Sequence, residues 1–341
     1  MASPRWVVLK FGGTSVSTLP RWETIARIVR DRLAEGLRPV VVCSALSGIS
    51  NALDRLLAEA MAGRGEAALE GIRRPHLELG RAMGLDAEAL LRPYFEELER
   101  ITLGAALLRE VTPRLQARVM AMGELMATTL GAAYLNRIGL TTQWWDAREL
   151  LEAVDEAHGN EARRYLSVAC DYRPDPALQE RLAAAPAEVI LTQGFIARNS
   201  RGETVLLGRG GSDTSAAYLA AKLQAERLEI WTDVPGMFTA NPRRSPRPAC
   251  FAISTTTRRR SWPPRAPKCC IRGAWSRARL RNPPARQMHG PSRAGRNDRI
   301  GRCTGRGPAC EGLLLEDRYH ARVGVAIGCA ADNCLADFLG T

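Results

Sequence analysis

The chain has 341 residues, of which 45% are hydrophobic and 25% charged, and its formal net charge is +12. This length and apolar content suffice for one large α/β domain with a buried core and a smaller second one. No stretch resembles a signal peptide or a membrane span, so we expect a cytoplasmic protein with no membrane partner.

The excess of basic residues is confined to the C-terminal part of the chain. Residues 246–341 carry 18 Lys and Arg against 6 Asp and Glu, whereas residues 1–245 carry 30 of each kind. Seven of the nine cysteines also lie in that segment, and only Cys43 and Cys170 precede it. This distribution indicates a reducing compartment and gives the first part of the chain no disulfide framework. A charge of +12 would ordinarily favour a nucleic-acid partner, but its confinement to a tail makes nucleic acid unlikely.

The first predicted elements are a strand, a tight turn and a helix. An apolar run from residue 7 ends at Lys10, two glycines and a Thr-Ser pair follow, and a helical pattern covers residues 21–35. Paired glycines let backbone N–H groups approach an anion, and a lysine at a strand end can neutralise a transferring phosphoryl group. On these residues alone, an ordinary Gly-Gly turn with a snorkelling lysine fits equally well.

A second buried strand is predicted at residues 39–43, and the hydroxyl-rich stretch 44–51 follows it. Polar groups at the carboxyl end of a parallel strand often bind ligands, although a plain helix N-cap explains them equally well. Helices are then expected from residue 51 to about 115 and from 117 to about 137. Within the second of these, Glu124 lies among Met, Leu and Ala, so its carboxylate is either exposed or placed for a ligand.

The remaining pattern alternates strands and helices, which predicts a mainly parallel sheet with helices on both faces. Further strands are expected at residues 141–146, 188–197, 203–207 and 228–231, with a hairpin-like turn at 198–202 and a helix at 216–224.

A second glycine loop lies at residues 208–215. It contains Arg209, suited to forked recognition of a carboxylate or phosphate, and Asp213, where a helix begins. With Lys10, these residues make a phosphoryl-transfer site arguable. Neither loop fits the G-x-x-x-x-G-K-[ST] pattern or the dinucleotide G-x-G-x-x-G pattern. The residues alone therefore leave the phosphoryl acceptor open.

Five stretches resemble, in the right order, the signatures of aspartate kinases within the amino acid kinase family: residues 10–15 (KFGGTS), 123–126 (GELM), 192–196 (TQGFI), 207–213 (LGRGGSD) and 231–236 (WTDVPG). The resemblance implies a three-layer αβα sandwich around a mainly parallel sheet, the amino acid kinase fold, over residues 1–245. It also implies the ATP- and Mg²⁺-dependent phosphorylation of L-aspartate to 4-phospho-L-aspartate, the first step toward lysine (through diaminopimelate), threonine and methionine. A homodimer is a further expectation from the family.

The same resemblance implies a role for each site residue. Lys10 would neutralise the transferring phosphoryl group, and Asp213 would hold Lys10 in position. No general base is required, because the substrate carboxylate is already ionised near neutral pH. At the substrate the implied contacts are Ser50, Glu124 (to the ammonium), Arg209 (to a carboxylate) and Ser212. At ATP they are Lys10, Phe11, Gly12, Gly13, Thr232, Asp233, Phe238 and Arg243. No residue is proposed as a metal ligand. Phe238 stands where the family usually has a tyrosine, so stacking is expected without a hydroxyl contact.

The resemblance stops after Arg244. Family members continue with a segment similar to DEAQELATTGAKVLHP, whose lysine reaches the nucleotide, and then with regulatory domains. Residues 255–272 read TTTRRRSWPPRAPKCCIR instead. Codons can be chosen for them that, read one base earlier, encode DYDEAQELATTGAKVLHP. We therefore interpret residues 246–341 as a basic, Arg/Pro/Cys-rich, out-of-frame tail and expect it to be disordered; a genuine nucleic-acid-binding arm is the alternative.

Two other functions remain open at this point. One is a different amino acid kinase, acting on glutamate or acetylglutamate. The other is a truncated, catalytically impaired remnant that binds ligands without turnover, because the segment with the late lysine is absent.

Overall fold

A computed structural model of the chain describes residues 4–154, 160–208, 210–232, 237–238, 250–251 and 324–329. Its main element is a six-stranded sheet of order β10-β7-β1-β2-β4-β3, in which every neighbouring pair of strands is parallel. This confirms the predicted mainly parallel sheet. The strands are β1 (Trp6–Phe11), β2 (Arg38–Cys43), β3 (Thr142–Trp145), β4 (Val189–Gln193), β7 (Arg227–Thr232) and β10 (Gly324–Cys329).

The continuous apolar runs of β1 and β2 reflect cover on both faces of the sheet. All six residues of β1 are buried, as are five of the six in β2. The register pairs Phe11 with Cys43 on one side and with Trp231 on the other. The carboxyl ends of β2, β1 and β7 therefore lie side by side at one edge of the sheet.

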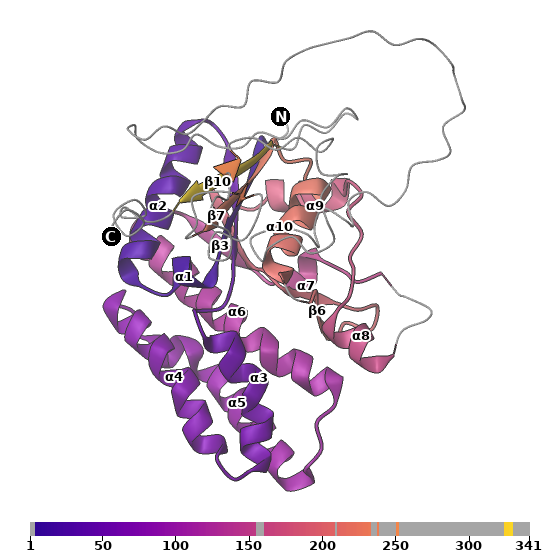
Figure 1. The fold of residues 1–341 in the computed structure, drawn as a ribbon. Coiled ribbons are helices and arrows are strands. Elements are labelled where there is room, and N and C mark those ends of the chain that lie inside the picture. Colours follow the sequence, from indigo (N-terminus) through magenta and orange to yellow (C-terminus); the bar gives the residue numbers. More distant parts are fainter. Residues whose placement is uncertain are drawn as a thin grey trace, which may run out of the picture.

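Helices cover the two faces, which gives three layers (Figure 1). Alternate residues of β1 separate two apolar clusters: Val7 and Leu9 pack with α2 and α6, whereas Val8 packs with α10. The layer on the first face contains α2 (Leu19–Ala34) and α6 (Pro113–Arg137), and the layer on the second contains α9 (Pro176–Ala183) and α10 (Gly211–Lys222).

A helical extension projects below the sheet in Figure 1. It consists of α3 (Ile49–Met61), α4 (Gly65–Ala82) and α5 (Ala87–Leu108), which pack on one another and on α6. A short loop separates α3 from α4, with Gly63 at φ +78°. The four helices α3 to α6 bury their apolar faces against one another, so this long helical stretch is stable without a strand between its helices.

The shorter elements complete the described part of the chain. The predicted hairpin is confirmed: β5 (Ile196–Arg198) pairs antiparallel with β6 (Thr204–Leu206). The others are α1 (Gly13–Val16), α7 (Ala147–Leu150), α8 (Glu161–Leu166), β8 (Met237–Phe238) and β9 (Cys250–Phe251).

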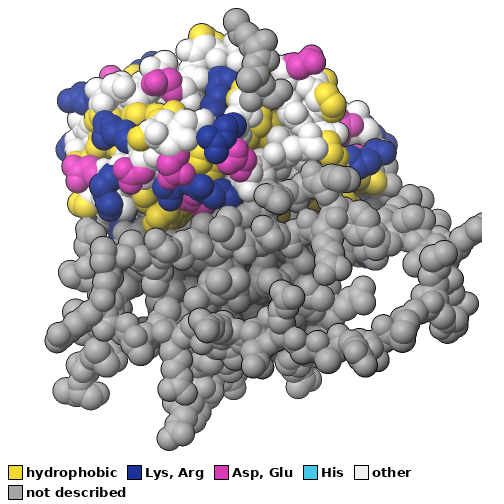
Figure 2. Space-filling model, turned by 90° about the horizontal axis from the view of Figure 1, so that it is seen from above, with side chains coloured by type: hydrophobic (Ala, Val, Ile, Leu, Met, Phe, Trp, Pro, Cys, Tyr) yellow, Lys and Arg dark blue, Asp and Glu magenta, His cyan; other side chains and the backbone are white. Residues whose placement is uncertain are grey.

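The visible surface of the described residues mixes charges of both signs. Seen from above in Figure 2, dark-blue Lys and Arg side chains alternate with magenta Asp and Glu side chains over this face. The mixture agrees with the equal numbers of acidic and basic residues before residue 246. No helix in the described ranges is both long and apolar enough to span a bilayer. Of the segment 246–341, only 250–251 and 324–329 are described, so the expectation of a disordered tail lies almost entirely outside the described residues.

Candidate active site

The centre of the candidate site is an ion pair between the central strand and the first turn of α10. The Nζ atom of Lys10 lies 2.7 Å from Oδ1 of Asp213, and the lysine is only 9% exposed. Lys10 points to the face of the sheet that α10 covers, because side chains alternate along β1. The ion pair is neutral overall, but an ammonium has three N–H donors, so Lys10 can also donate to a further anion at the edge where the glycine loop begins.

The glycine loop and the loop after β2 form one continuous surface. A Cβ atom on Gly13 would lie 2.9 Å from the carbonyl oxygen of Ala45, so the two backbones can approach only because this residue is glycine. The hydroxyl of Ser17 joins the loops, since it donates to the Gly13 carbonyl (2.7 Å) and accepts from the backbone N–H of Ser47 (2.8 Å). The predicted polar loops at the ends of β1 and β2 are therefore neighbours in space.

Glu124 is buried beside the same loop. Its helix α6 approaches so closely that a Cβ on Gly123 would lie 2.8 Å from the Cβ of Ala45. Glu124 is 3% exposed, and its Oε2 has no hydrogen-bond partner among the described residues. Burial raises the pKa of this carboxyl to about 8, although a backbone hydrogen bond from Ala45 opposes the shift. Of the two alternatives left open by the sequence, an exposed carboxylate is thereby excluded, and the unpartnered oxygen favours a cationic ligand.

Two predicted substrate residues lie at the starts of helices near this surface. Ser50 is half-buried in the first turn of α3, and Ser212 is half-buried in the first turn of α10. A Cβ on Gly194 would lie 2.5 Å from the Cβ of Ser212, so the glycine permits α10 to pack on the turn that follows β4.

Phe195, in that turn, is a residue of the site that the sequence analysis did not nominate. Its φ is +71°, a backbone conformation that costs a non-glycine residue about 1–3 kcal/mol. Its backbone N–H donates to the hydroxyl of Ser215 on α10 (2.8 Å), which helps to hold the conformation. A backbone dihedral has no signature in the residue types, so the sequence carried no signal for this strain.

A second missed feature is a buried hydrogen-bond network one turn beyond Glu124. The hydroxyl of Thr128 donates to the Glu124 carbonyl (2.8 Å) and accepts from Gln193 Nε2 (2.8 Å) and Trp144 Nε1 (3.0 Å). Gln193 Oε1 in turn accepts from the backbone N–H of Ala147 (2.8 Å). The network ties α6 to β3 and β4, and it therefore fixes the position of Glu124 relative to the sheet.

The nucleotide half of the predicted site is described only in part. Lys10, Phe11, Gly12 and Gly13 form the end of β1 and its loop, and a Cβ on Gly12 would lie 3.6 Å from Lys10 Nζ. Asp233 and Arg243, two other predicted nucleotide residues, lie outside the described residues, as does Arg209, which was predicted at the substrate. Thr232 and Phe238 are placed by their backbones in β7 and β8, and their side chains lie outside the description.

Within the described ranges, no group of three or more His, Cys, Asp or Glu side chains could enclose a metal ion. Mg²⁺ commonly binds one or two carboxylates together with substrate phosphates and water. The donor set here fits a metal carried largely by phosphate oxygens, with Asp213 as the acidic side chain beside the glycine loop.

Comparison with known proteins agrees with this geometry. Residues 5–251 match the model of the amino acid kinase family. The chain is 35% identical to the lysine-sensitive aspartokinase 3 of Escherichia coli over 248 residues, which is 70% of this chain and 51% of that protein. It is 30% identical to the chloroplastic aspartokinase 1 of Arabidopsis thaliana, covering 69% of this chain and 41% of that protein.

Solved structures give the same result. The crystal structure of E. coli aspartokinase III in complex with aspartate and ADP superposes with a TM-score of 0.61 at 33% identity, covering 74% of this chain and 54% of that one. The complex of the same enzyme with lysine and aspartate gives a TM-score of 0.59 at 33% identity. This chain therefore spans about half the length of these relatives, or less.

Proposed function

The chain belongs to the amino acid kinase family, and from that premise we propose that residues 1–245 form a catalytic domain that phosphorylates the side-chain carboxylate of L-aspartate. ATP would be the donor, and the products would be 4-phospho-L-aspartate and ADP. The observation that carries the proposal is the convergence on the loop at Ala45 of the glycine loop that follows the buried cation Lys10 and of the helix that carries the buried, half-unpartnered carboxyl of Glu124. A related structure that contains aspartate and ADP supports this choice of substrates.

In the proposed reaction, an oxygen of the aspartate side-chain carboxylate forms a bond to the γ-phosphorus as the bond from that phosphorus to the ADP oxygen breaks. Lys10 would offset negative charge on the moving phosphoryl group, and Asp213 keeps its ammonium in place. Backbone N–H groups of Gly12 and Gly13 would bind phosphate oxygens. The acceptor is already ionised at neutral pH, so no residue has to remove a proton.

Glu124 would determine the recognition of the substrate. Its unpartnered Oε2 suits the α-ammonium of an amino acid, which would replace the proton that burial favours on the carboxyl. Ser50, Arg209 and Ser212 are proposed to bind the rest of the substrate. Thr232, Asp233, Phe238 and Arg243 are proposed to bind the nucleotide.

Mg²⁺ would accompany ATP and neutralise charge on its phosphates when bound. Asp213 is the described carboxylate best placed to orient it, either directly or through water. We also propose that the chain assembles as a homodimer and supplies the first intermediate of lysine, threonine and methionine synthesis.

For the remainder of the chain we propose a reading-frame change near residue 245. The match to the family model ends at residue 251, which supports a break close to this position. Resequencing codons 240–280 and translating all three frames tests the change directly. Recovery of the segment with the late lysine in the earlier frame would support it, and its absence would leave the basic tail as genuine protein.

A coupled assay of ADP release, with hydroxylamine to trap the acyl phosphate, tests the activity. The purified chain is given L-aspartate, L-glutamate or N-acetyl-L-glutamate in separate reactions. Hydroxamate formation with aspartate alone supports the proposal, whereas product from glutamate alone would overturn the choice of acceptor. Binding of ATP without release of ADP would identify an impaired remnant, and the chain encoded by the earlier frame then serves as the matched active control.

A further inference from the structure

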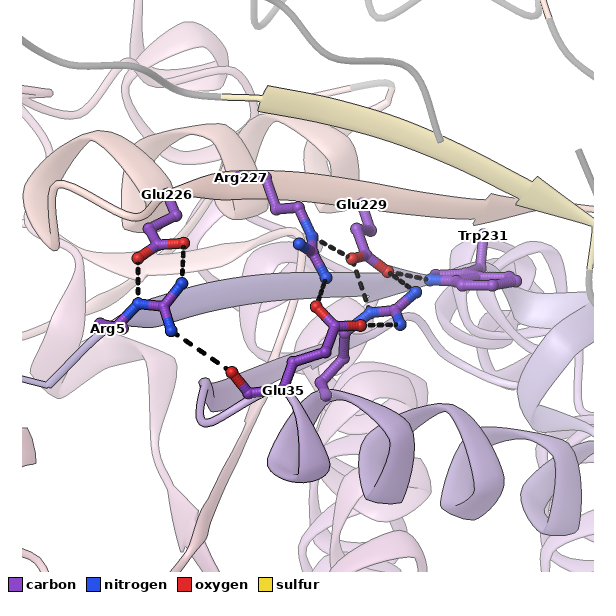
Figure 3. A network of polar contacts seen from close by, with 7 residues as sticks. Arg5, Glu35, Glu226, Arg227, Glu229 and Trp231 are labelled. Carbon is purple, nitrogen blue, oxygen red and sulfur yellow. Dashed lines mark hydrogen bonds and ion pairs between the residues drawn. The ribbon is translucent and has the colours of Figure 1, made fainter. Parts of the chain in front are cut away.

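A partly buried ion-pair cluster occupies the α2 face of the sheet and extends along β7 from Arg227 to Trp231, which pairs with Phe11 beside the glycine loop (Figure 3). At its centre is Glu229 of β7, which is 1% exposed. Its Oε1 accepts from Nε of Arg32 (2.7 Å) and Nε of Arg227 (2.6 Å). Its Oε2 accepts from Nη2 of Arg32 (3.1 Å) and from the indole N–H of Trp231 (3.2 Å). We call Arg32, Arg227, Glu229 and Trp231 the Glu229 cluster.

A charged cluster is unexpected at this position. Glu229 of β7 pairs with Leu9 of β1, and the neighbours of Leu9 on this face of the sheet belong to the main apolar cluster. Burying a carboxylate with two guanidinium groups seldom stabilises a fold more than apolar side chains of similar size would. A net stabilisation of the fold therefore explains the Glu229 cluster poorly, and a role in fixing one conformation explains it better.

The Glu229 cluster is connected to the glycine loop through two aromatic rings. The ring of Trp231 stacks on the ring of Phe11, with centroids 6.2 Å apart and an angle of 18° between their planes. Phe11 is fully buried and directly precedes Gly12. The indole N–H of Trp231 donates a hydrogen bond to the Glu229 carboxylate, and this hydrogen bond restricts rotation of the tryptophan ring.

The end of β1 is thus held from both faces of the sheet. On one face Phe11 rests on Trp231, and on the other Lys10 pairs with Asp213. Because side chains alternate along a strand, movement of Phe11 would move Lys10 and the glycine loop with it. The stacked rings therefore link the Glu229 cluster on β7 to the residue that precedes the glycine loop.

We propose that Glu229 is a positioning residue for the nucleotide loop: it orients Trp231, which fixes Phe11 and thereby the backbone of Gly12 and Gly13. This inference rests on the proposed function, which makes ATP the ligand of that loop. Glu229 itself touches no reacting atom in this scheme.

Removing Glu229 would leave Arg32 and Arg227, which both also pair with Glu35, with one carboxylate between two guanidinium groups, and this could disturb the fold by itself. The decisive variant is therefore Trp231→Phe. It keeps an aromatic ring on Phe11 and removes only the indole N–H and the smaller ring. The matched control is Glu226→Gln, which removes the charge of the ion pair with Arg5 at the exposed end of the same network (Figure 3). The side chains of Arg5 and Glu226 are 59% and 41% exposed, and the ion pair between them touches neither Trp231 nor Phe11.

Calorimetric titration of the full chain with MgATP is the first measurement. The Trp231→Phe variant is expected to bind ATP about 3- to 10-fold more weakly than the unmodified chain, as for the loss of one hydrogen bond of ordinary strength, while its affinity for L-aspartate stays unchanged. The Glu226→Gln variant is expected to bind both ligands as before. Equal ATP affinity in Trp231→Phe and the unmodified chain would overturn the positioning role.

Hydrogen exchange of the peptide that spans residues 10–17 provides a second readout without any ligand. Its exchange is expected to rise at least about threefold in Trp231→Phe and to stay unchanged in Glu226→Gln, because the loop loses support only in the first. If the unmodified chain binds no ATP, the proposed function fails, and this exchange measurement still decides the positioning role. Equal exchange in all three proteins would overturn it.

Discussion

The ammonium nitrogen of Lys10, at the end of the central strand, lies 2.7 Å from a carboxylate oxygen of Asp213, in the first turn of α10. The two residues are 203 positions apart in the chain, and the parallel sheet brings them together. The pair joins the two glycine loops that the sequence analysis treated separately. Its importance for phosphoryl transfer can be measured against a similar pair elsewhere in the protein.

Lys10→Met is expected to lower the rate of aspartate-dependent ADP release by about 10²–10³-fold, since it removes the cation that faces the transferring group. Asp213→Asn should lower the rate less, because Lys10 keeps its charge but loses its orientation. The matched control is Lys222→Met. Lys222 pairs with Asp175 at 3.0 Å near the other end of α10 and is similarly buried, with 12% of its side chain exposed. A comparable loss of rate in Lys222→Met would show that the effect of Lys10→Met is structural.

The pKa of Glu124 predicts how aspartate binding depends on pH. Burial raises this pKa to about 8, so the carboxyl must lose its proton before it can pair with an ammonium. The Kd for L-aspartate is therefore expected to rise about tenfold for each pH unit below 8 and to level off above it. Glu124→Gln should bind aspartate weakly at every pH, without this slope. Calorimetry from pH 6 to 9 provides the measurement, and a flat profile for the unmodified chain would contradict the assignment.

The same carboxyl should affect stability in the opposite direction. A raised pKa in the folded state means that the protonated carboxyl favours folding; this contribution is complete below the unfolded pKa of about 4.5 and is lost as the pH rises through 8. Glutamine does not ionise, so Glu124→Gln does not lose this stability as the pH rises. The thermal midpoint of the variant minus that of the unmodified chain should therefore be larger at pH 8.5 than at pH 5. Calorimetric melts at the two pH values test the sign, and an equal difference at both would contradict it.

His76 predicts a loss of stability in acid. It is fully buried in α4, where burial lowers its pKa to about 4, and its Nε2 has no partner in the described part of the chain. The neutral ring favours folding fully above pH 6.5, and this contribution is lost as the pH falls from 6.5 toward 4, by up to about 3 kcal/mol. Urea titrations at pH 4.5 and 7 measure the difference in the free energy of unfolding between the two pH values, and His76→Leu should remove most of that difference. An unchanged difference would mean that other groups control unfolding in acid.

Thr128→Val tests the network that positions Glu124. The variant leaves the N–H groups of Gln193 and Trp144 without their shared acceptor, at a cost of about 1–3 kcal/mol of stability for each unpaired group. The Kd for aspartate should also rise several-fold, because α6 loses its fixed distance from β4. The control is Thr129→Val on the same helix, whose hydroxyl bonds the Leu125 carbonyl and Tyr94 instead. If both variants bind aspartate equally well, the network has no part in recognition.

The sequence predicted the parts of the site that depend on local chemistry. Apolar β-branched runs such as residues 39–43 suit a buried strand in a sheet covered on both faces, and the paired glycines Gly12 and Gly13 favour a turn directly after β1. The residues of both glycine loops were therefore identified before their distance was known. The hairpin after β4 followed from its turn residues in the same way.

The residue types could not decide how Glu124 or Glu229 is used. Apolar and small residues surround Glu124 in the sequence on every side of its helix, so its exposure depended on whether α3 and the loop at Ala45 covered it. Glu229 reads as an ordinary strand residue, because the two arginines that neutralise it are Arg227, two positions away, and Arg32, on a helix almost 200 residues earlier.

By itself the sequence determined the fold class and the two glycine loops with their lysine and aspartate, because these follow from periodicity, turn chemistry and charge within short stretches; the role of each site residue came from the family resemblance and stays a prediction. Only the tertiary structure decided that Lys10 meets Asp213, that Glu124 is buried with a free oxygen, and that the stacked rings of Phe11 and Trp231 rest on Glu229. Each of these relationships joins segments far apart in the chain. Their pKa values, orientation and energies depend on desolvation and on partners that only packing brings together.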